Sequence, residues 1–70
     1  QPPEDSTDVL SVIEGVLEAE EDAIATYRAL IDAAEEADDP VTEDLAVTLL
    51  ADEEAHRTEF RGYRKEYKQD

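Results

Sequence analysis

The stretch that decides the predicted fold is Glu36-Ala37-Asp38-Asp39-Pro40, near the middle of a chain of 70 residues. Asp39 is a favourable N-cap, and a proline at the next position, Pro40, suits the first turn of a helix. The segments on either side are long and the connection between them is short, so two helices there must run antiparallel as a hairpin. The sequence therefore predicts an all-α fold with its turn at this stretch.

Apolar residues recur at helical spacing on both sides of the turn, without strand-like alternation. Before it they are Val9, Ile13, Val16, Leu17, Ile24, Tyr27, Leu30, Ile31 and Ala34. After it they are Leu45, Leu49, Phe60, Tyr63 and Tyr67, with Val41, Ala46 and Leu50 at the edges of the face. We predict helices over residues of about 8–37 and 40–67, within a single domain of residues 1–70. The prolines near the start predict a disordered lead-in over residues 1–7, with Ser6, Thr7 or Asp8 available as helix cap.

The chain is strongly acidic, with 21 acidic residues against six basic ones and a formal net charge of −15. Such a surface repels phosphate backbones, which argues against binding of nucleic acid. Two interpretations of the charge remain: the solvated surface of a salt-adapted (halophilic) organism, or a field that attracts metal cations. The chain has no cysteine and no apolar run long enough to cross a membrane, so we expect a cytoplasmic protein without disulfides or a membrane partner.

The basic residues are concentrated towards the C-terminus. Cations there complement the negative end of a helix dipole. The alternative is a basic docking patch for an acidic partner, such as a second copy of the chain. Five of the six basic residues follow the single histidine: Arg57, Arg61, Arg64, Lys65 and Lys68.

Three ionisable residues interrupt the apolar faces of the predicted helices. Glu20 falls within the stripe of the first helix, and Glu53 and His56 occupy inward positions on the second. The latter two are three residues apart, so they share one helix face about a turn apart. Counted from the turn, Glu20 and His56 are about 18 residues away and Glu53 about 15, which places all three roughly 25 Å from it. A cluster of two carboxylates and an imidazole follows, and such donors suit a metal ion.

Simpler explanations exist for each residue taken alone. Glu20 belongs to a run of acidic residues, which is usually a solvated face, and a lone inward histidine is more often a core residue than a ligand. Glu53 can form an ion pair with Arg57, one turn further along the helix. However, Glu20, Glu53 and His56 agree in face, height and chemistry, and a buried unpaired carboxylate is costly. We therefore predict that the three bind a metal ion together.

The lone Glu20 and the later run Asp52-Glu53-Glu54-Ala55-His56 resemble the C-terminal half of a ferritin-like protein, especially bacterioferritins and the Dps-like ferritins of archaea. The run Asp39-Pro40-Val41-Thr42-Glu43-Asp44-Leu45 is similar as well, and the resemblance covers nearly the whole chain after Asp8. It implies a four-helix bundle with a carboxylate-bridged di-iron centre that oxidises Fe(II) with O2 or peroxide, in iron storage or detoxification.

The resemblance also implies roles for single residues. Glu20 matches the lone helix glutamate of the family, Glu53 the carboxylate that bridges two irons, and His56 the terminal imidazole ligand. Tyr27 resembles the tyrosine that related proteins place beside the metals, which would make it a catalytic residue; the alternative is a core aromatic. Iron is the expected metal, with manganese and zinc as alternatives.

The chain departs from the family because it supplies only half of a di-iron site, which needs two lone glutamates and two Glu-x-x-His units. Two hairpins in a homodimer or larger homo-oligomer would complete the set, as in encapsulated ferritins. Alternatively, the chain is the C-terminal part of a longer ferritin-like protein.

Three functions remain open at this point: a ferroxidase, a metal-binding storage or scaffold subunit without turnover, and a non-catalytic dimerisation module with a buried Glu/His network. The outer acids Glu21 and Glu54 either pass Fe(II) inward or are simply solvated.

Overall fold

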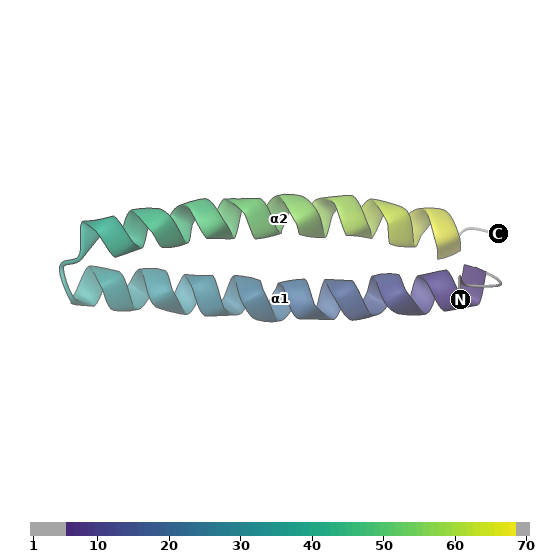
Figure 1. Ribbon diagram of the computed structural model, residues 1–70, viewed down its shortest axis with the longest axis horizontal. Helices are drawn as coiled ribbons and strands as arrows, with labels where there is room; N and C mark the ends of the chain where they lie inside the picture. Colours follow the sequence, from purple (N-terminus) through teal and green to yellow (C-terminus); the bar gives the residue numbers. More distant parts are fainter. Residues whose placement is uncertain (1–5, 69–70) are drawn as a thin grey trace.

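The computed structural model describes residues 6–68, which form two helices joined by a tight turn (Figure 1). Helix α1 spans Ser6–Glu36, helix α2 spans Pro40–Lys68, and residues 6–68 contain no strand. The predicted all-α hairpin is confirmed. Because α1 already includes Ser6 and Thr7, the prediction of a disordered lead-in is wrong for those two residues. The rest of that prediction concerns residues outside the described part of the chain.

Paired hydrogen bonds close the turn at the end of α1. Asp38 takes the left-handed conformation, with a φ of 55°. Its N–H donates to the carbonyl of Glu35 at 3.1 Å, and the N–H of Asp39 donates to the carbonyl of Ala34 at 2.9 Å. This pattern is a Schellman motif, in which a left-handed residue lets the chain satisfy the last carbonyls of the helix. Aspartate tolerates that conformation better than most L residues do.

Asp39 caps the start of α2. Its Oδ1 accepts a hydrogen bond from the N–H of Thr42 at 3.1 Å, and its Oδ2 accepts one from the Thr42 hydroxyl at 2.6 Å. These two bonds hold the pKa of Asp39 below its usual value. Across the turn, a hydrogen bond with the Glu35 carboxyl raises the pKa of Glu43, with desolvation and repulsion as smaller causes. The turn therefore favours an ionised cap at Asp39.

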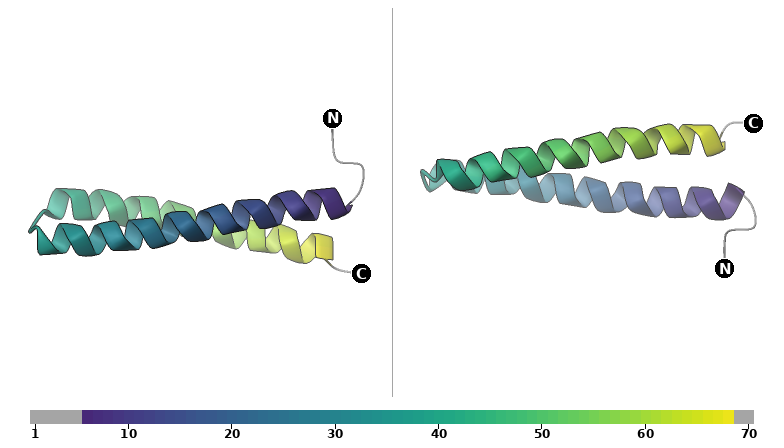
Figure 2. Two further views of the ribbon diagram at one scale, coloured as in Figure 1. Left: turned by 90° about the horizontal axis from the view of Figure 1, so that it is seen from below. Right: turned by 45° about the horizontal axis from the view of Figure 1, so that its top comes forward.

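The interface between the two helices is thin. Between residues 8 and 68 the buried residues are all apolar: Ile13, Leu17, Ile24, Ala34 and Ala46. The molecule measures 50 × 20 × 15 Å, and its radius of gyration of 15.8 Å exceeds the roughly 11 Å of a compact domain of this length. The helices cross at a shallow angle, and the start of α1 lies at the same end as the end of α2 (Figure 2).

The two long sides of the hairpin differ in chemistry. One side, here called the ion-paired side, carries three inter-helix ion pairs of 3.1 Å, which join Glu21 to Arg57, Glu21 to Arg61 and Glu54 to Arg28. The opposite side, here called the open side, carries apolar side chains that remain exposed: Val12, Leu30, Leu45, Tyr63 and Tyr67.

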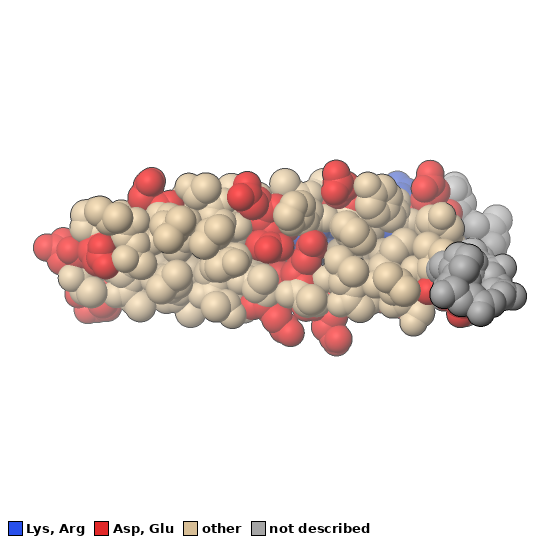
Figure 3. Space-filling view, in the orientation of Figure 1, with Lys and Arg blue, Asp and Glu red and all other residues tan. Residues whose placement is uncertain are grey.

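Helical periodicity shows that these two sides face apart. Glu21 lies nine positions after Val12 and Arg61 lies sixteen positions after Leu45, so the members of each pair point about 160–180° apart around their helix. Of the predicted apolar face of α2, Leu45, Tyr63 and Tyr67 are exposed, because residues 6–68 form a single pair of helices with no further layer. Their inward placement is therefore wrong for the single hairpin, and Ala46, predicted at the edge of the face, is the buried residue of α2. Carboxylates are spread along the face in Figure 3, where Lys and Arg side chains are barely visible.

Candidate metal centre

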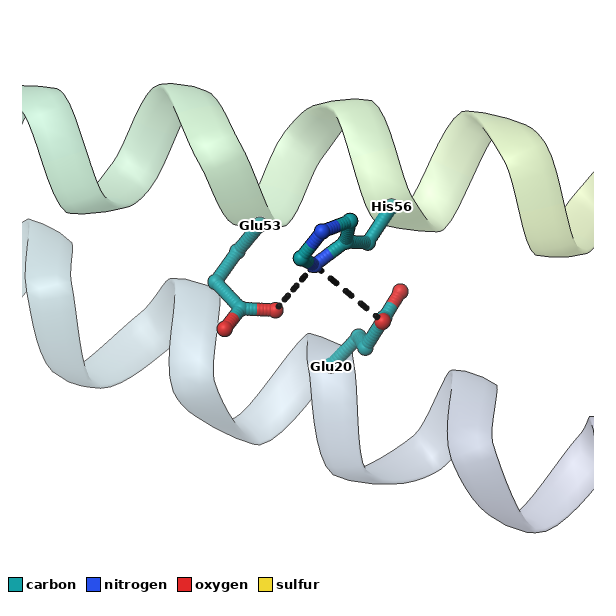
Figure 4. A group of neighbouring side chains, drawn as sticks. All are labelled: Glu20, Glu53 and His56. Carbon is teal, nitrogen blue, oxygen red and sulfur yellow. Dashed lines mark ion pairs between the residues drawn. The ribbon is translucent and has the colours of Figure 1, made fainter.

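Glu20, Glu53 and His56 come together part-way along the hairpin (Figure 4). Nδ1 of His56 lies 3.6 Å from Oε1 of Glu53 and 3.9 Å from Oε2 of Glu20. One ligand atom from each residue lies within 4.8 Å of the others. The structure thus brings together, from both helices, the three residues that the sequence predicts as a cluster.

Hydrogen bonds do not close this cluster. The distances of 3.6 and 3.9 Å are too long for hydrogen bonds, whose usual limit is roughly 3.2 Å. Oε1 of Glu20 is buried and has no hydrogen-bond partner among the described residues. The Glu20 side chain is only 12% exposed, so this unpaired oxygen is held in a position where water cannot readily compensate it. A bound cation would satisfy it.

The spacing of the three groups fits one metal ion. Two atoms that each bind an ion at about 2.1 Å are no more than roughly 4.2 Å apart. Both contacts of His56, at 3.6 and 3.9 Å, are within that limit, and the outer bound of 4.8 Å for the whole cluster exceeds it only slightly. Carboxylate and imidazole donors suit iron, manganese and zinc. Three donors leave coordination positions of such an ion unfilled.

The cluster faces the open side of the hairpin. The exposed fraction of the side chains rises from 12% for Glu20 through 25% for Glu53 to 56% for His56. His56 is eleven residues from Leu45 and seven from Tyr63, so it points within about 20° of these two exposed residues around α2. The inward position predicted for His56 is therefore wrong within one chain, which leaves the imidazole edge of the cluster uncovered.

Comparison with known protein families identifies the family of this two-helix chain. The family model described as the ferritin-like domain matches residues 1–69. The chain belongs to the ferritin-like family. No match was found among curated proteins or among solved structures. Within residues 6–68, neither helix combines the length and apolar character that a membrane span requires.

In this ferritin-like hairpin, the arginines beside the cluster have partners that the sequence did not predict. Arg57 donates from Nη1 to Oε1 of Glu21 at 3.1 Å, and not to Glu53. Arg61 donates from Nη2 to the other oxygen of Glu21, also at 3.1 Å. The simpler explanation of Glu53 as the ion-pair partner of Arg57 is therefore wrong. These two arginines form ion pairs within their own chain, so fewer basic side chains are available for the docking patch considered above.

Both outer acids considered as carriers of Fe(II) are engaged by arginines. Glu21 is bound at both oxygens, and Oε2 of Glu54 accepts from Nη2 of Arg28 at 3.1 Å. Neither is simply a solvated carboxylate, and neither has its full charge available for a passing cation. No sequence pattern pointed to these pairs, because their members lie 26 to 40 residues apart.

Tyr27 is half-buried and lies about two turns from Glu20 towards the connecting turn, roughly 10 Å along α1. Its assignment beside the metals stays a prediction. Tyr63 instead contacts Phe60, edge to face, with ring centroids 5.1 Å apart, as a packing residue does.

Proposed function

We propose that two copies of this hairpin share a di-iron centre and oxidise Fe(II) with O2 or peroxide, as an iron storage or detoxification protein. The half-site supports this proposal: each chain holds two carboxylates and one imidazole together, with a buried carboxylate oxygen that lacks a partner. Di-iron centres of this family take four carboxylates and two imidazoles. Two chains related by a two-fold axis supply that set from Glu20, Glu53 and His56.

The exposed surface supports a second copy as the partner. The chain exposes 5167 Å², whereas a compact monomer of 7.8 kDa exposes about 4,400 Å². The larger area reflects the elongated shape of the hairpin, which leaves its open side uncovered for an interface with a partner. The exposed apolar residues of the open side are available for that interface, and His56 lies among them.

The three residues would have different roles in the shared centre. On the family resemblance, Glu53 would bind both ions, while Glu20 and His56 would each bind one. Iron bound there would supply the electrons for reduction of O2 or peroxide, one from each Fe(II). The carboxylates offset the charge of the cations, and packing around Glu20 holds its oxygens in place. Tyr27 is assigned a catalytic role beside them on the family resemblance alone.

Metal loading tests the proposal. The purified chain, loaded anaerobically with Fe(II), should contain about one iron per chain, and its mass in solution should be that of a dimer or a multiple of it. Glu53→Ala and His56→Ala should abolish Fe(II) oxidation and lower the thermal stability of the metal-loaded protein. Glu18→Ala, at an exposed position of α1, is the matched control and should change neither. Full oxidation activity in both site variants would contradict the assignment.

A non-catalytic dimerisation module is the second candidate. The approach of His56 to both carboxylates favours it, because charged contacts at 3.6 and 3.9 Å also occur in proteins as purely structural ion pairs. The unpaired oxygen of Glu20 argues against it, because a structural network would be expected to satisfy its members. A dimer that takes up no iron and keeps its association in His56→Ala would identify the module.

A further inference from the structure

We infer that Glu21 is a positioning residue for the metal centre, which holds Arg57 away from Glu53 and so keeps Glu53 available as a ligand. The inference rests on the metal site proposed above. It concerns a residue outside the ligand set, on the ion-paired side of the hairpin. Its basis is the competition between two carboxylates for one guanidinium.

Glu21 is held at both of its oxygens. Arg57 donates to Oε1 and Arg61 to Oε2, each at 3.1 Å, from successive turns of α2. Glu21 directly follows Glu20, and Arg57 directly follows His56, so this contact crosses between the helices at the height of the metal cluster. The ion pair and the cluster therefore occupy opposite edges of the same level of the hairpin.

Glu53 is the carboxylate that Arg57 would otherwise reach. The two lie four residues apart on α2, with the glutamate first, which is the order that favours an ion pair on one helix. The Arg57 side chain is only 20% exposed, and its Nε is buried without a hydrogen-bond partner among the described residues. An unused buried donor costs free energy, so an Arg57 released from Glu21 gains by pairing with Glu53.

A guanidinium on Glu53 would weaken metal binding in two ways. It would occupy carboxylate oxygens that the metal needs, and it would place a positive charge beside the cation. Glu21 prevents both by offering Arg57 a partner on the other helix. The role of Glu21 is therefore to set which carboxylate stays free.

Calorimetric titration of the full chain with Co²⁺ measures the affinity for metal and tests this competition without reference to oxidation activity. Glu21→Gln should weaken Co²⁺ binding by about tenfold or more, in the range usual for residues that support metal ligands. Arg57→Gln should bind at least as tightly as the wild type, because the competing cation is gone. The double variant Glu21→Gln/Arg57→Gln should regain the affinity of Arg57→Gln.

Glu54→Gln is the matched control. It removes one negative charge and one inter-helix ion pair of the same 3.1 Å length, with Arg28, and should leave the affinity unchanged. A purely structural role for Glu21 predicts that the double variant binds as weakly as Glu21→Gln, and that result would overturn the inference. Wild-type affinity in Glu21→Gln would overturn it as well.

The same titration separates this inference from the proposed function. No Co²⁺ binding by the wild type would remove the metal site itself and the inference with it. Binding by the wild type together with unchanged binding by Glu21→Gln would remove only the inference. Circular dichroism of each variant reports helix content, and recovery of affinity by the double variant cannot come from restored folding, because that variant still lacks the ion pair.

Discussion

Replacement of Glu20 by leucine should stabilise the metal-free hairpin. The side chain is 12% exposed and Oε1 is buried without a partner, a state that costs about 1–3 kcal/mol. Leucine would remove that cost and extend the apolar contact between Leu17 and Ile24, the buried residues one turn away on either side. We expect the free energy of unfolding in EDTA to rise by about 1–3 kcal/mol, which corresponds to roughly 5–20 °C in Tm for a chain of this size.

Thermal and urea unfolding, followed by circular dichroism in EDTA, measure this change. Protein concentration must be held constant, because association alters apparent stability. Glu18→Leu makes the same change of charge at an exposed position of α1 and should shift stability by no more than about 0.5 kcal/mol. Excess Co²⁺ should then stabilise the wild type and Glu18→Leu but not Glu20→Leu.

Two results would refute this reasoning separately. Equal stability of Glu20→Leu and Glu18→Leu in EDTA would show that Glu20 is not an unsatisfied buried group. Stabilisation of Glu20→Leu by Co²⁺ to the wild-type extent would show that Glu20 is not a ligand.

Three further predictions concern the turn and the surface charge. Asp38→Gly should raise the free energy of unfolding in urea by up to about 1 kcal/mol, because glycine adopts the φ of 55° without the steric cost of a side chain. Asp39→Ala should lower the urea midpoint at neutral pH. Because folding lowers the pKa of Asp39, the stability that its carboxylate contributes is present above the ordinary pKa of 3.8 and is lost as pH falls through the folded pKa. The difference in midpoint from the wild type should therefore vanish in acid. Added KCl should raise the Tm of the metal-free chain, because salt screens the repulsion within a net charge of −15; a falling Tm would show that the arginine ion pairs outweigh that repulsion.

The hairpin could be predicted because its determinants are local. The start of α2 depends on Pro40 and on the cap that Asp39 forms with Thr42, three residues away. Helical periodicity likewise depends only on the residues of one segment. The cluster of Glu20 and His56 could be predicted because antiparallel helices joined by a short turn share a common length scale, so equal distances from the turn become equal heights.

The partner of Arg57 could not be predicted in the same way. Glu53 is four residues away on the same helix, whereas Glu21 is 36 residues away on the other. Which of them the guanidinium reaches depends on the rotation of α1 about its own axis against α2, and apolar periodicity defines that rotation only as a broad stripe.

The order of burial in the cluster links metal binding to association. Glu20 is buried by its own hairpin, so its unpaired oxygen is present in each separate chain, whereas His56 lies on the open side, where a single chain provides no cover. A second copy on the open side would exclude water from His56 and strengthen the attraction between each carboxylate and the metal, since charges interact more strongly in a less polar medium. By linkage, the same free energy makes the metal favour the dimer. The affinity for metal should therefore rise with protein concentration until the dimer is fully formed, which a site completed within one chain would not show.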